Sequence, residues 1–306
     1  MALDVVGLGY CSLDYLLRIP RIPDFEDGVR VSDFAIDGGG PVATAMVTLA
    51  RLGATVGYVG KFGNDEVGRL KRKQLQQEGV DVSRAILVEG EISSLFFALV
   101  DERTGRRGFL GYYGTEAELC PEELDREYIT SAGFLHLDGR HAAAALQAAE
   151  WMHEIGGKVV LDAAGGKRDR SISPQMEALV RATDVLIAAQ GFAVALTARD
   201  DLAEAGKALL DYGPQIVAIT AGEAGSWCVT VEDCFHAPSF SVEVVDTTGA
   251  GDVYHGGFIY GLLQGWGLKR VTTFANAVAA LKCRKMGGRS GIPTLKAAEQ
   301  FLAEHV

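Results

Sequence analysis

The stretch from Val244 to Phe258 most constrains how this chain can fold, because it joins two patterns that need different backbone structures. A β-branched, apolar run (Phe240–Val245) leads into it and predicts a buried strand. Between this run and the following residues lies Gly249-Ala250-Gly251, which almost lacks side chains. Behind the turn, apolar residues recur at helical spacing: Val253, Phe258, Ile259, Leu262 and Leu263. The stretch therefore predicts a strand, a tight glycine turn and a helix.

The glycine turn is a candidate anion site. The backbone N–H groups of residues 249–251 open a helix, where unpaired donors and the macrodipole favour an anion. Asp252 follows in the first helical turn. A carboxylate there stabilises a helix N-terminus, but beside a phosphate-sized anion it also repels the ligand unless it has a chemical task. Accepting a proton from an attacking hydroxyl is such a task, so Asp252 is a candidate general base.

The motif Asp246-Thr247-Thr248-Gly249-Ala250-Gly251-Asp252, followed by an apolar helix, resembles the second signature of the ribokinase (PfkB) family of carbohydrate kinases. The resemblance implies that the amides of Gly249, Ala250 and Gly251 form the anion hole for the transferred phosphoryl group. It also implies that Asp252 is the catalytic base on a sugar hydroxyl. The cofactors implied are ATP and Mg²⁺.

Composition and charge limit the classes of protein to which the chain can belong. The 306 residues suffice for one large domain, or for one domain with a small appendage. The formal charge of -11 argues against a nucleic-acid partner, which would favour a basic face. Because neither a long apolar window nor a signal-like start is found, we expect no membrane segment and a cytoplasmic location. Five scattered cysteines predict reduced thiols rather than a zinc site.

Two other routes to nucleotide binding have little support. The chain has no G-x-x-x-x-G-K-[ST] motif, so a P-loop is absent. Val5–Gly9 predicts a first buried strand, and it runs into Gly7-x-Gly9-x-x-Ser12. That segment lacks the third glycine of the dinucleotide fingerprint, which argues against an NAD-dependent dehydrogenase.

Two β-rich segments, approximately 15–37 and 91–113, interrupt an otherwise regular β–α alternation. The second predicts a hairpin around the turn Asp101–Gly105. The resemblance implies that the two segments form a small β-sheet lid, which closes over the sugar and serves as a homodimer interface. The expected fold is a ribokinase-like α/β domain over residues 1–306, with a central, mostly parallel sheet between two layers of helices.

The resemblance also implies a sugar site near the N-terminus. Asp14 follows the first strand, and an aspartate at this place binds sugar hydroxyls in the family. The turn Gly38-Gly39-Gly40-Pro41 and the helix behind it resemble the family's first signature, which implies sugar contacts from Gly39, Gly40 and Thr44. The family usually has asparagine where Thr44 stands, so ribose cannot be assumed as the substrate.

Two further segments are assigned, one to the nucleotide and one to a cation. Ile216–Ser226 resembles the T-x-G-x-x-G segment that borders the nucleotide, and a plain hairpin turn is the alternative. The loop 287–293 resembles the part of the family that binds a monovalent cation. The residues implied for the nucleotide are Thr220, Gly222, Gly225, Thr248 and Asn276, and those implied for K⁺ are Asp246, Thr248, Gly288 and Ser290.

The chain departs from the family at two places, and the second bears on Mg²⁺. The D-x-N-x-R segment reads Asp162-Ala163-Ala164, with Arg168 and Arg170 further on. The N-x-x-E segment reads Ala189-Gln190-Gly191-Phe192, so only Gln190 could substitute. How the metal is held is therefore open. His255, in the signature helix, is interpreted as a packing residue.

The substrate is predicted only as a class. The run Asp246–Pro293 is similar to the sulfofructose kinase branch, and Arg140 could bind an anionic substituent, as an arginine does in that branch. In that branch an asparagine binds the sulfonate, but Gly111 stands at its place here, and the segment Phe25–Asp37 contains no lysine. We expect phosphorylation of a primary hydroxyl on a ketose, sugar acid or sugar phosphate. A sulfofructose kinase, a nucleoside kinase of the same fold and a non-catalytic sugar- or nucleotide-binding protein are the alternatives.

Overall fold

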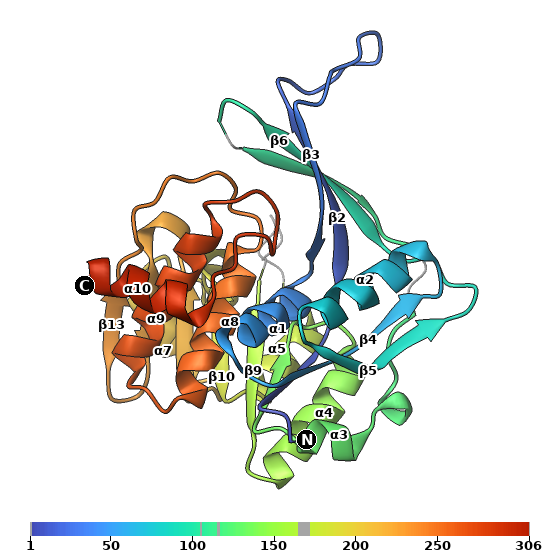
Figure 1. Cartoon of the computed structure of the whole chain (residues 1–306). Helices are drawn as coiled ribbons and strands as arrows, with labels where there is room; N and C mark the ends of the chain where they lie inside the picture. The colour runs from blue at the N-terminus through green and yellow to red at the C-terminus, as the bar shows by residue number, and fades with distance from the viewer. Residues whose placement is uncertain (1, 105, 115–116, 165–171, 306) are drawn as a thin grey trace.

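A nine-stranded sheet forms the centre of the protein (Figure 1). The structure is a computed structural model, and it describes residues 2–104, 106–114, 117–164 and 172–305. The strand order is β13-β12-β11-β10-β9-β8-β1-β4-β5. The strands are β1 (Val5–Leu8), β4 (Val56–Gly63), β5 (Asp81–Val88), β8 (Phe134–Leu137), β9 (Lys158–Ala163), β10 (Val185–Ala189), β11 (Ile216–Thr220), β12 (Ser226–Val229) and β13 (Cys234–Ala237). Pairing is parallel from β5 to β11, and β12 and β13 join antiparallel. Arg168 and Arg170 lie outside the described residues.

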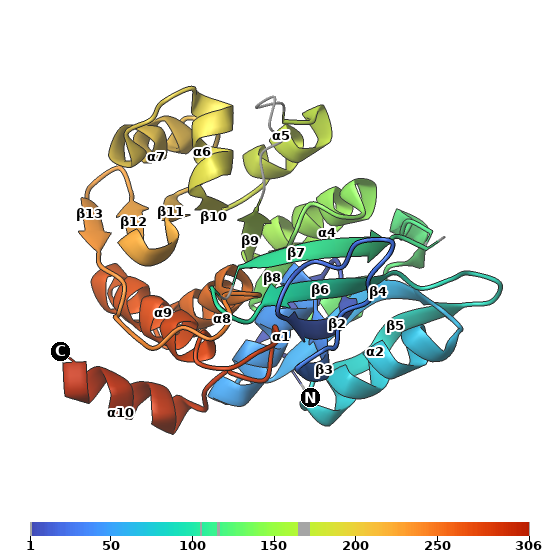
Figure 2. The same cartoon turned by 90° about the horizontal axis from the view of Figure 1, so that it is seen from above.

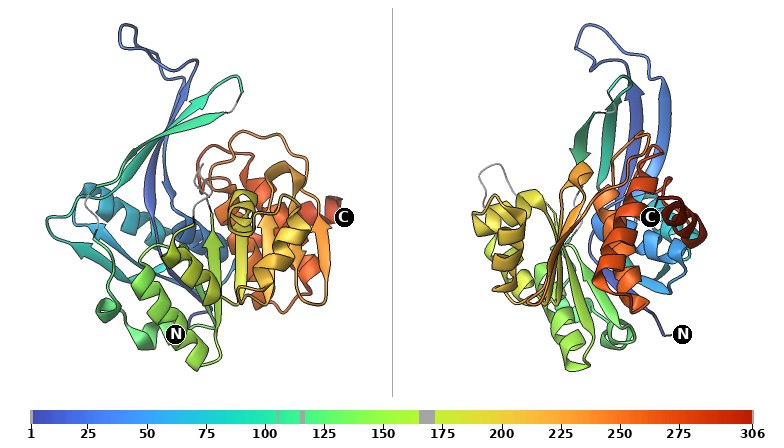
Figure 3. Two further views of the ribbon diagram at one scale, coloured as in Figure 1. Left: turned by 180° about the vertical axis from the view of Figure 1, so that it is seen from behind. Right: turned by 90° about the vertical axis from the view of Figure 1, so that its left-hand side faces the viewer.

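Helices cover both faces of this sheet, which is why its parallel strands carry continuous rather than alternating apolar residues (Figures 2 and 3). One face packs against α1 (Pro41–Leu52), α2 (Glu66–Gln77), α8 (Ala250–Leu263), α9 (Leu268–Lys282) and α10 (Leu295–His305). The other packs against α3 (Arg126–Thr130), α4 (Ala142–Glu154), α5 (Pro174–Arg181), α6 (Gln190–Thr197) and α7 (Leu202–Leu210). Two short 3₁₀ turns, η1 (Pro121–Glu123) and η2 (Gly222–Ala224), complete the elements. The predicted three-layer α/β fold is confirmed.

Helix ends follow local sequence signals. α1 starts with Pro41 after Gly40 and stops at Gly53, whose left-handed φ of 103° lets its N–H bond back to the last turn. α2 starts after Asp65, whose carboxylate accepts the N–H of Gly68 at 2.7 Å. Within the described part of the chain, no helix has the length and apolar character needed to cross a membrane.

A second, four-stranded sheet stands away from the main body (Figures 1 and 3). Its order is β3-β2-β6-β7, with β2 (Ser12–Ile19), β3 (Asp33–Gly39), β6 (Leu95–Asp101) and β7 (Arg107–Tyr112). β2 pairs antiparallel with β3 and parallel with β6, so the sheet joins two segments that are far apart in the sequence. Because β2 begins at Ser12 and β3 ends at Gly39, the root of this sheet adjoins the first turn of α1.

The strand predicted over Phe240–Val245 is wrong. These residues form no strand, and Val244 and Val245 keep 58% and 37% of their surface exposed. β13 is the edge strand of the main sheet, and the run that follows it leaves the sheet instead of pairing with the open edge of β13. Phe240, Val242 and Val244 of this run instead line the cavity described below. The predicted helix and glycine turn that follow are both present.

Candidate active site

The N-terminus of α8 presents an open stretch of backbone. Gly249 caps the helix with a φ of 74°, a conformation that favours glycine. A Cβ on Gly249 would lie 2.9 Å from the carbonyl oxygen of Gly288, so this glycine permits close packing of the 286–291 loop. A Cβ on Gly251 would meet nothing within 4 Å. The first turn of α8 is therefore held from one side and accessible from the other.

A cavity of about 740 Å³ lies beside this turn. Its volume falls in the range of small-molecule and cofactor sites. The lining residues come from the β11–β12 connection, the 239–247 segment, α8 and α9: Thr220, Gly222, Glu223, Gly225, Ser239, Phe240, Ser241, Val242, Val244, Thr247, Ala250, Gly251, Tyr254, Asn276, Ala279, Ala280 and Cys283. Among the predicted nucleotide residues, Thr220, Gly222, Gly225 and Asn276 line the cavity. Thr248 does not, because it is turned toward Asp246.

Asn276 also holds the wall of this cavity together. Its side-chain amide donates to the carbonyl oxygens of Ala237 and Pro238, at 3.0 and 3.2 Å. Its side-chain oxygen accepts the Ser226 hydroxyl at 3.1 Å, and the Tyr254 hydroxyl donates to the same Ser226 oxygen. The asparagine therefore connects α9 to the edge of the main sheet.

Carboxylates gather at the carboxyl ends of the strands, around Asp252. Burial, the Asp138 carboxylate and the Asp14 carboxylate raise the pKa of Asp252 to about 6, against the opposing effect of Arg289 and Lys282. Burial raises the pKa of Asp162 as well, and so do the neighbouring carboxylates of Asp252 and Asp138. At neutral pH Asp252 is thus mostly ionised, yet basic enough to accept a proton.

Asp138 was not among the predicted site residues. Its carboxylate accepts the backbone N–H groups of Tyr10 and Arg140, at 2.7 and 3.1 Å. It directly follows β8, while Asp162 lies near the end of β9, and open α/β sheets bind ligands at these ends. Asp138 could therefore have been identified from the sequence as a carboxylate that directly follows a buried apolar run.

The predicted sugar residues meet at the root of the small sheet. Asp14 lies within β2 rather than directly behind β1, and its buried carboxylate accepts the Ser12 hydroxyl at 2.8 Å. A Cβ on Gly39 would lie 2.4 Å from Asp14 Oδ2, so the glycine makes room for this carboxyl group. Gly40 makes room for the backbone, because its Cβ would approach the Tyr10 carbonyl to 2.6 Å. Thr44 is fully buried, and its hydroxyl oxygen accepts Arg289 Nε at 3.3 Å.

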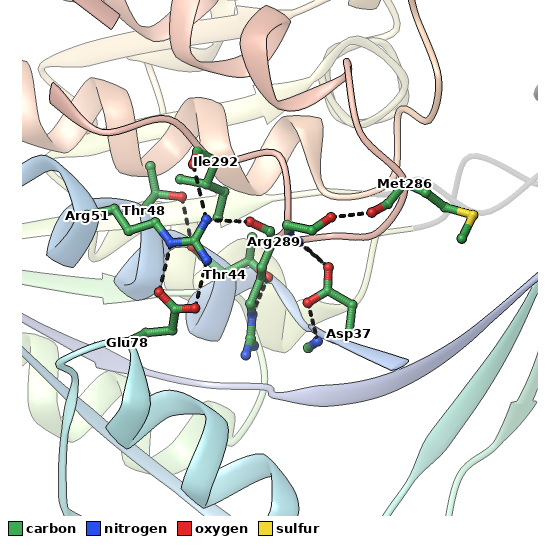
Figure 4. A network of polar contacts seen from close by, with 10 residues as sticks. Asp37, Thr44, Thr48, Arg51, Glu78, Met286, Arg289 and Ile292 are labelled. Carbon is green, nitrogen blue, oxygen red and sulfur yellow. Dashed lines mark hydrogen bonds and ion pairs between the residues drawn. The ribbon is translucent and has the colours of Figure 1, made fainter. Parts of the chain in front are cut away.

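Arg289, also missed by the sequence analysis, connects this region to the C-terminal loop (Figure 4). Its guanidinium donates to the carbonyl oxygen of Gly39 at 2.6 Å. Its backbone N–H binds the Asp37 carboxylate, and its carbonyl oxygen accepts Arg51. Arg51 in turn forms a two-bond ion pair with Glu78. Nη1 of Arg289 is buried without a hydrogen-bond partner among the described residues.

Arg140 is exposed at the same end of the sheet. Its guanidinium lies 4.7 Å from the centre of the Tyr10 ring, a cation–π contact. Its backbone N–H binds Asp138. Arg140 thus stands beside the carboxylate cluster, while its charged group faces solvent.

The residues predicted to hold a monovalent cation are only partly together. The Asp246 carboxylate accepts the N–H and hydroxyl of Thr248 and the N–H of Gly287, at 2.7–2.9 Å. Ser290, by contrast, is exposed, and it donates its hydroxyl to Met286 and its N–H to Asp37. Fully buried Lys282 donates its ammonium group to the Asp246 carbonyl oxygen at 2.9 Å.

An open glycine helix end, an adjacent carboxylate and a cavity of nucleotide size are the parts of a phosphotransferase site. Residues 2–295 match the family model described as pfkB family carbohydrate kinase. The chain is 33% identical over 300 residues to the ATP-dependent ribose-1-phosphate kinase of Halopiger xanaduensis, with 98% of each chain covered. It is 28% identical over 320 residues to the 5-dehydro-2-deoxygluconokinase of Clostridium beijerinckii, covering 99% of this chain and 93% of that protein.

A solved structure of a ribokinase also matches the whole fold. The ribokinase of Thermotoga maritima superposes with a TM-score of 0.83 at 25% identity, covering 98% of this chain and 99% of the other. The chain therefore belongs to the pfkB family of carbohydrate kinases, and it is a phosphotransferase that acts on an alcohol group.

We predict that Gly251→Ala separates stability from activity. Alanine in a helix is more stable than glycine by about 0.5–1 kcal/mol, so the unfolding free energy should not fall. The new methyl group would enter the open space above the first turn, so kcat should drop on the order of 10²-fold. Gly267→Ala is the matched control, because a Cβ there also meets nothing but lies away from the site. Wild-type turnover in Gly251→Ala, measured by ADP release, would contradict the assignment.

Proposed function

We propose that the protein transfers the γ-phosphoryl group of ATP to a primary hydroxyl of an anionic sugar, with Asp252 as the general base. The observation that carries the proposal is the position of Asp252. It lies in the first turn of α8, with the open amides of residues 249–251 beside it and Asp14 close enough to raise its pKa. One carboxylate thus adjoins both the nucleotide cavity and the root of the small sheet.

The described residues fit ATP. Thr220, Gly222, Gly225 and Asn276 would border the nucleoside, and the backbone of residues 249–251 would face the phosphates. Mg²⁺ supplies charge neutralisation for the phosphates when it is bound. No carboxylate follows β10, since α6 begins with Gln190, so we propose that the metal is held mainly by the nucleotide and water at that side.

In this proposal each residue has one task. Asp14, Gly39, Gly40 and Thr44 position the sugar, and Asp252 removes the proton of the attacking hydroxyl. The amides of residues 249–251 stabilise the charge on the transferred group. The small sheet acts as a lid that excludes water, and its exposed apolar side chains support a homodimer through the same sheet: Phe34, Ile36, Phe97, Phe109, Leu110 and Tyr112.

An anionic sugar is supported by two arginines and by the relatives. Arg140 presents an exposed guanidinium beside the carboxylate cluster, and Arg289 has a buried Nη1 without a partner among the described residues. Both relatives reported above are named for anionic substrates, a sugar phosphate and a sugar acid. Sulfofructose is a further anionic candidate, although Gly111 and the lysine-free segment 25–37 offer it fewer partners. A nucleoside kinase of the same fold is the second candidate.

The pH dependence of turnover tests the base. Because Asp252 acts only when ionised and its pKa is raised to about 6, kcat/KM should be constant at neutral pH and fall as the pH drops through about 6. Asp252→Asn should lower kcat by about 10²–10⁴-fold and remove this limb. A wild-type rate that does not change between about pH 5 and 8 would show that another group takes the proton.

A substrate screen tests the sugar class. ADP release should be fastest with an anionic sugar when ribose 1-phosphate, 5-dehydro-2-deoxygluconate, sulfofructose, ribose, fructose and nucleosides are compared. Arg140→Gln should raise KM for the best anionic substrate by about 10- to 100-fold with little change in kcat, because a charge-assisted hydrogen bond is lost. Exposed Arg126 in α3, which pairs with Glu154 at the end of α4, provides the control Arg126→Gln. Equal rates with neutral nucleosides would favour the nucleoside kinase.

The K⁺ site predicted from the sequence can be tested through Lys282, which we propose serves as the local cation in place of K⁺. Its ammonium group already binds the Asp246 carbonyl, so we expect K⁺ to change wild-type activity only slightly. Lys282→Met keeps the volume but removes the charge, so this variant should lose activity and regain it, at least in part, with added K⁺. The activity of the wild type and of Lys282→Met, measured in Na⁺ and in K⁺, decides whether the lysine or K⁺ is the local cation. A strongly K⁺-dependent wild type would show that the lysine does not serve as the local cation.

A further inference from the structure

A buried cluster of two histidines and one aspartate lies one helical turn below Asp252. His136 comes from β8, Asp162 from β9 and His255 from α8; β8 and β9 pair in the main sheet, and α8 packs against β9. Side chains alternate along a strand, and the apolar neighbours of His136 and Asp162 (Leu135, Leu137, Leu161 and Ala163) belong to the core on the α4 side. His136 and Asp162 therefore point to the opposite face, toward α8.

The helix completes the cluster. His255 follows Asp252 by three residues, so the two side chains share a face of α8. Nε2 of His255 lies 3.5 Å from Oδ2 of Asp162, and the two imidazole rings lie 5.4 Å apart between centres. His136, Asp162 and His255 keep only 0%, 3% and 4% of their surface exposed. One ligand atom from each of the three lies within 4.8 Å of the other two.

Two imidazole nitrogens of the cluster lack partners. Nε2 of His136 and Nδ1 of His255 are buried without a hydrogen bond to any described residue. Nδ1 of His136 lies 3.3 Å from the Val160 carbonyl oxygen, which can only accept, so Nε2 carries the lone pair. Metal-binding histidines commonly make this contact from their second nitrogen. A fully buried nitrogen that carries a lone pair and has no hydrogen bond to a described residue is available to a metal ion.

The local charge also favours a cation. Besides burial, the carboxylates of Asp252 and Asp138 lie close enough to raise the pKa of Asp162, so a positive ion at Asp162 would relieve this repulsion. Two imidazoles and one carboxylate suit a transition-series ion such as Zn²⁺ or Co²⁺, whereas Mg²⁺ and Ca²⁺ prefer oxygen ligands.

We propose that His136, Asp162 and His255 form a binding site for one divalent transition-metal ion, separate from the Mg²⁺ that accompanies the nucleotide. Ligand atoms of a tetrahedral Zn²⁺ site lie roughly 3.4 Å apart, so the three side chains need to draw together by on the order of 1 Å. The three protein ligands leave a fourth position for water. The site lies between the sheet and α8, so a bound ion would fix the helix that carries Asp252.

Co²⁺ titration of the chelator-treated protein, without Mg²⁺ or nucleotide, tests the proposal. Co²⁺ bound to histidine nitrogen gives a visible absorption band, and we expect it to saturate at one ion per chain and to be displaced by Zn²⁺. One equivalent of Zn²⁺ should also raise the melting temperature. Because this readout needs no turnover, it is independent of the proposed kinase substrate. Wild-type protein that shows neither the band nor the stabilisation would overturn the proposal.

Variants locate the ion. His136→Asn keeps a donor for the Val160 carbonyl while it removes Nε2, and His255→Gln keeps a donor near Asp162. Each should weaken Co²⁺ binding by at least about 10-fold. His153→Asn is the matched control, since His153 lies exposed on α4 and should leave binding unchanged. Wild-type affinity in both folded cluster variants would place the ion elsewhere and overturn the assignment, and the wild-type titration decides alone if a variant fails to fold.

Discussion

The buried guanidinium of Arg289 is the contact on which the rest of the site depends. It binds the Gly39 carbonyl at the root of the small sheet and the Thr44 hydroxyl in α1, while its own loop packs Gly288 against Gly249 at the start of α8. A buried charge is costly unless hydrogen bonds compensate it, so this arginine specifies one arrangement of three segments. The position of the root of the small sheet is thereby coupled to the position of the glycine turn that begins α8.

The same positive charge balances an acidic centre. Asp14, Asp138, Asp162 and Asp252 converge where the parallel strands end, and each lies in surroundings that raise its pKa. Arg289 and Lys282 oppose the rise in the pKa of Asp252, so this carboxylate stays ionised near neutral pH. Two uncharged neighbours, His136 and His255, fill the space below it. Electrostatics, rather than any single hydrogen bond, therefore sets the chemistry available here.

Sequence and structure agree best where the signal is local. The glycine turn and helix over 249–263 and the regular β–α alternation could be predicted, because φ preferences and apolar periodicity act within a few residues. The strand expected at Phe240–Val245 is absent, because a β-branched apolar run can face either a core or a cavity and its sequence does not distinguish the two. Thr248 was placed with the nucleotide, yet its hydroxyl is held by Asp246, a contact that depends on how the turn folds back.

The sequence by itself determined the family, the three-layer fold and the candidate base Asp252, because a short motif with fixed spacing carries all three. Only the tertiary structure decided which distant residues share that site. Asp138 stands far along the chain from Lys282 and Arg289, and although it follows a buried apolar run, nothing in the local sequence indicates that the three meet before the strands align. His136, Asp162 and His255 meet for the same reason: the sheet and α8 bring together side chains that are separated by up to 119 residues in the sequence, and burial leaves two of their nitrogens without a hydrogen-bond partner among the described residues.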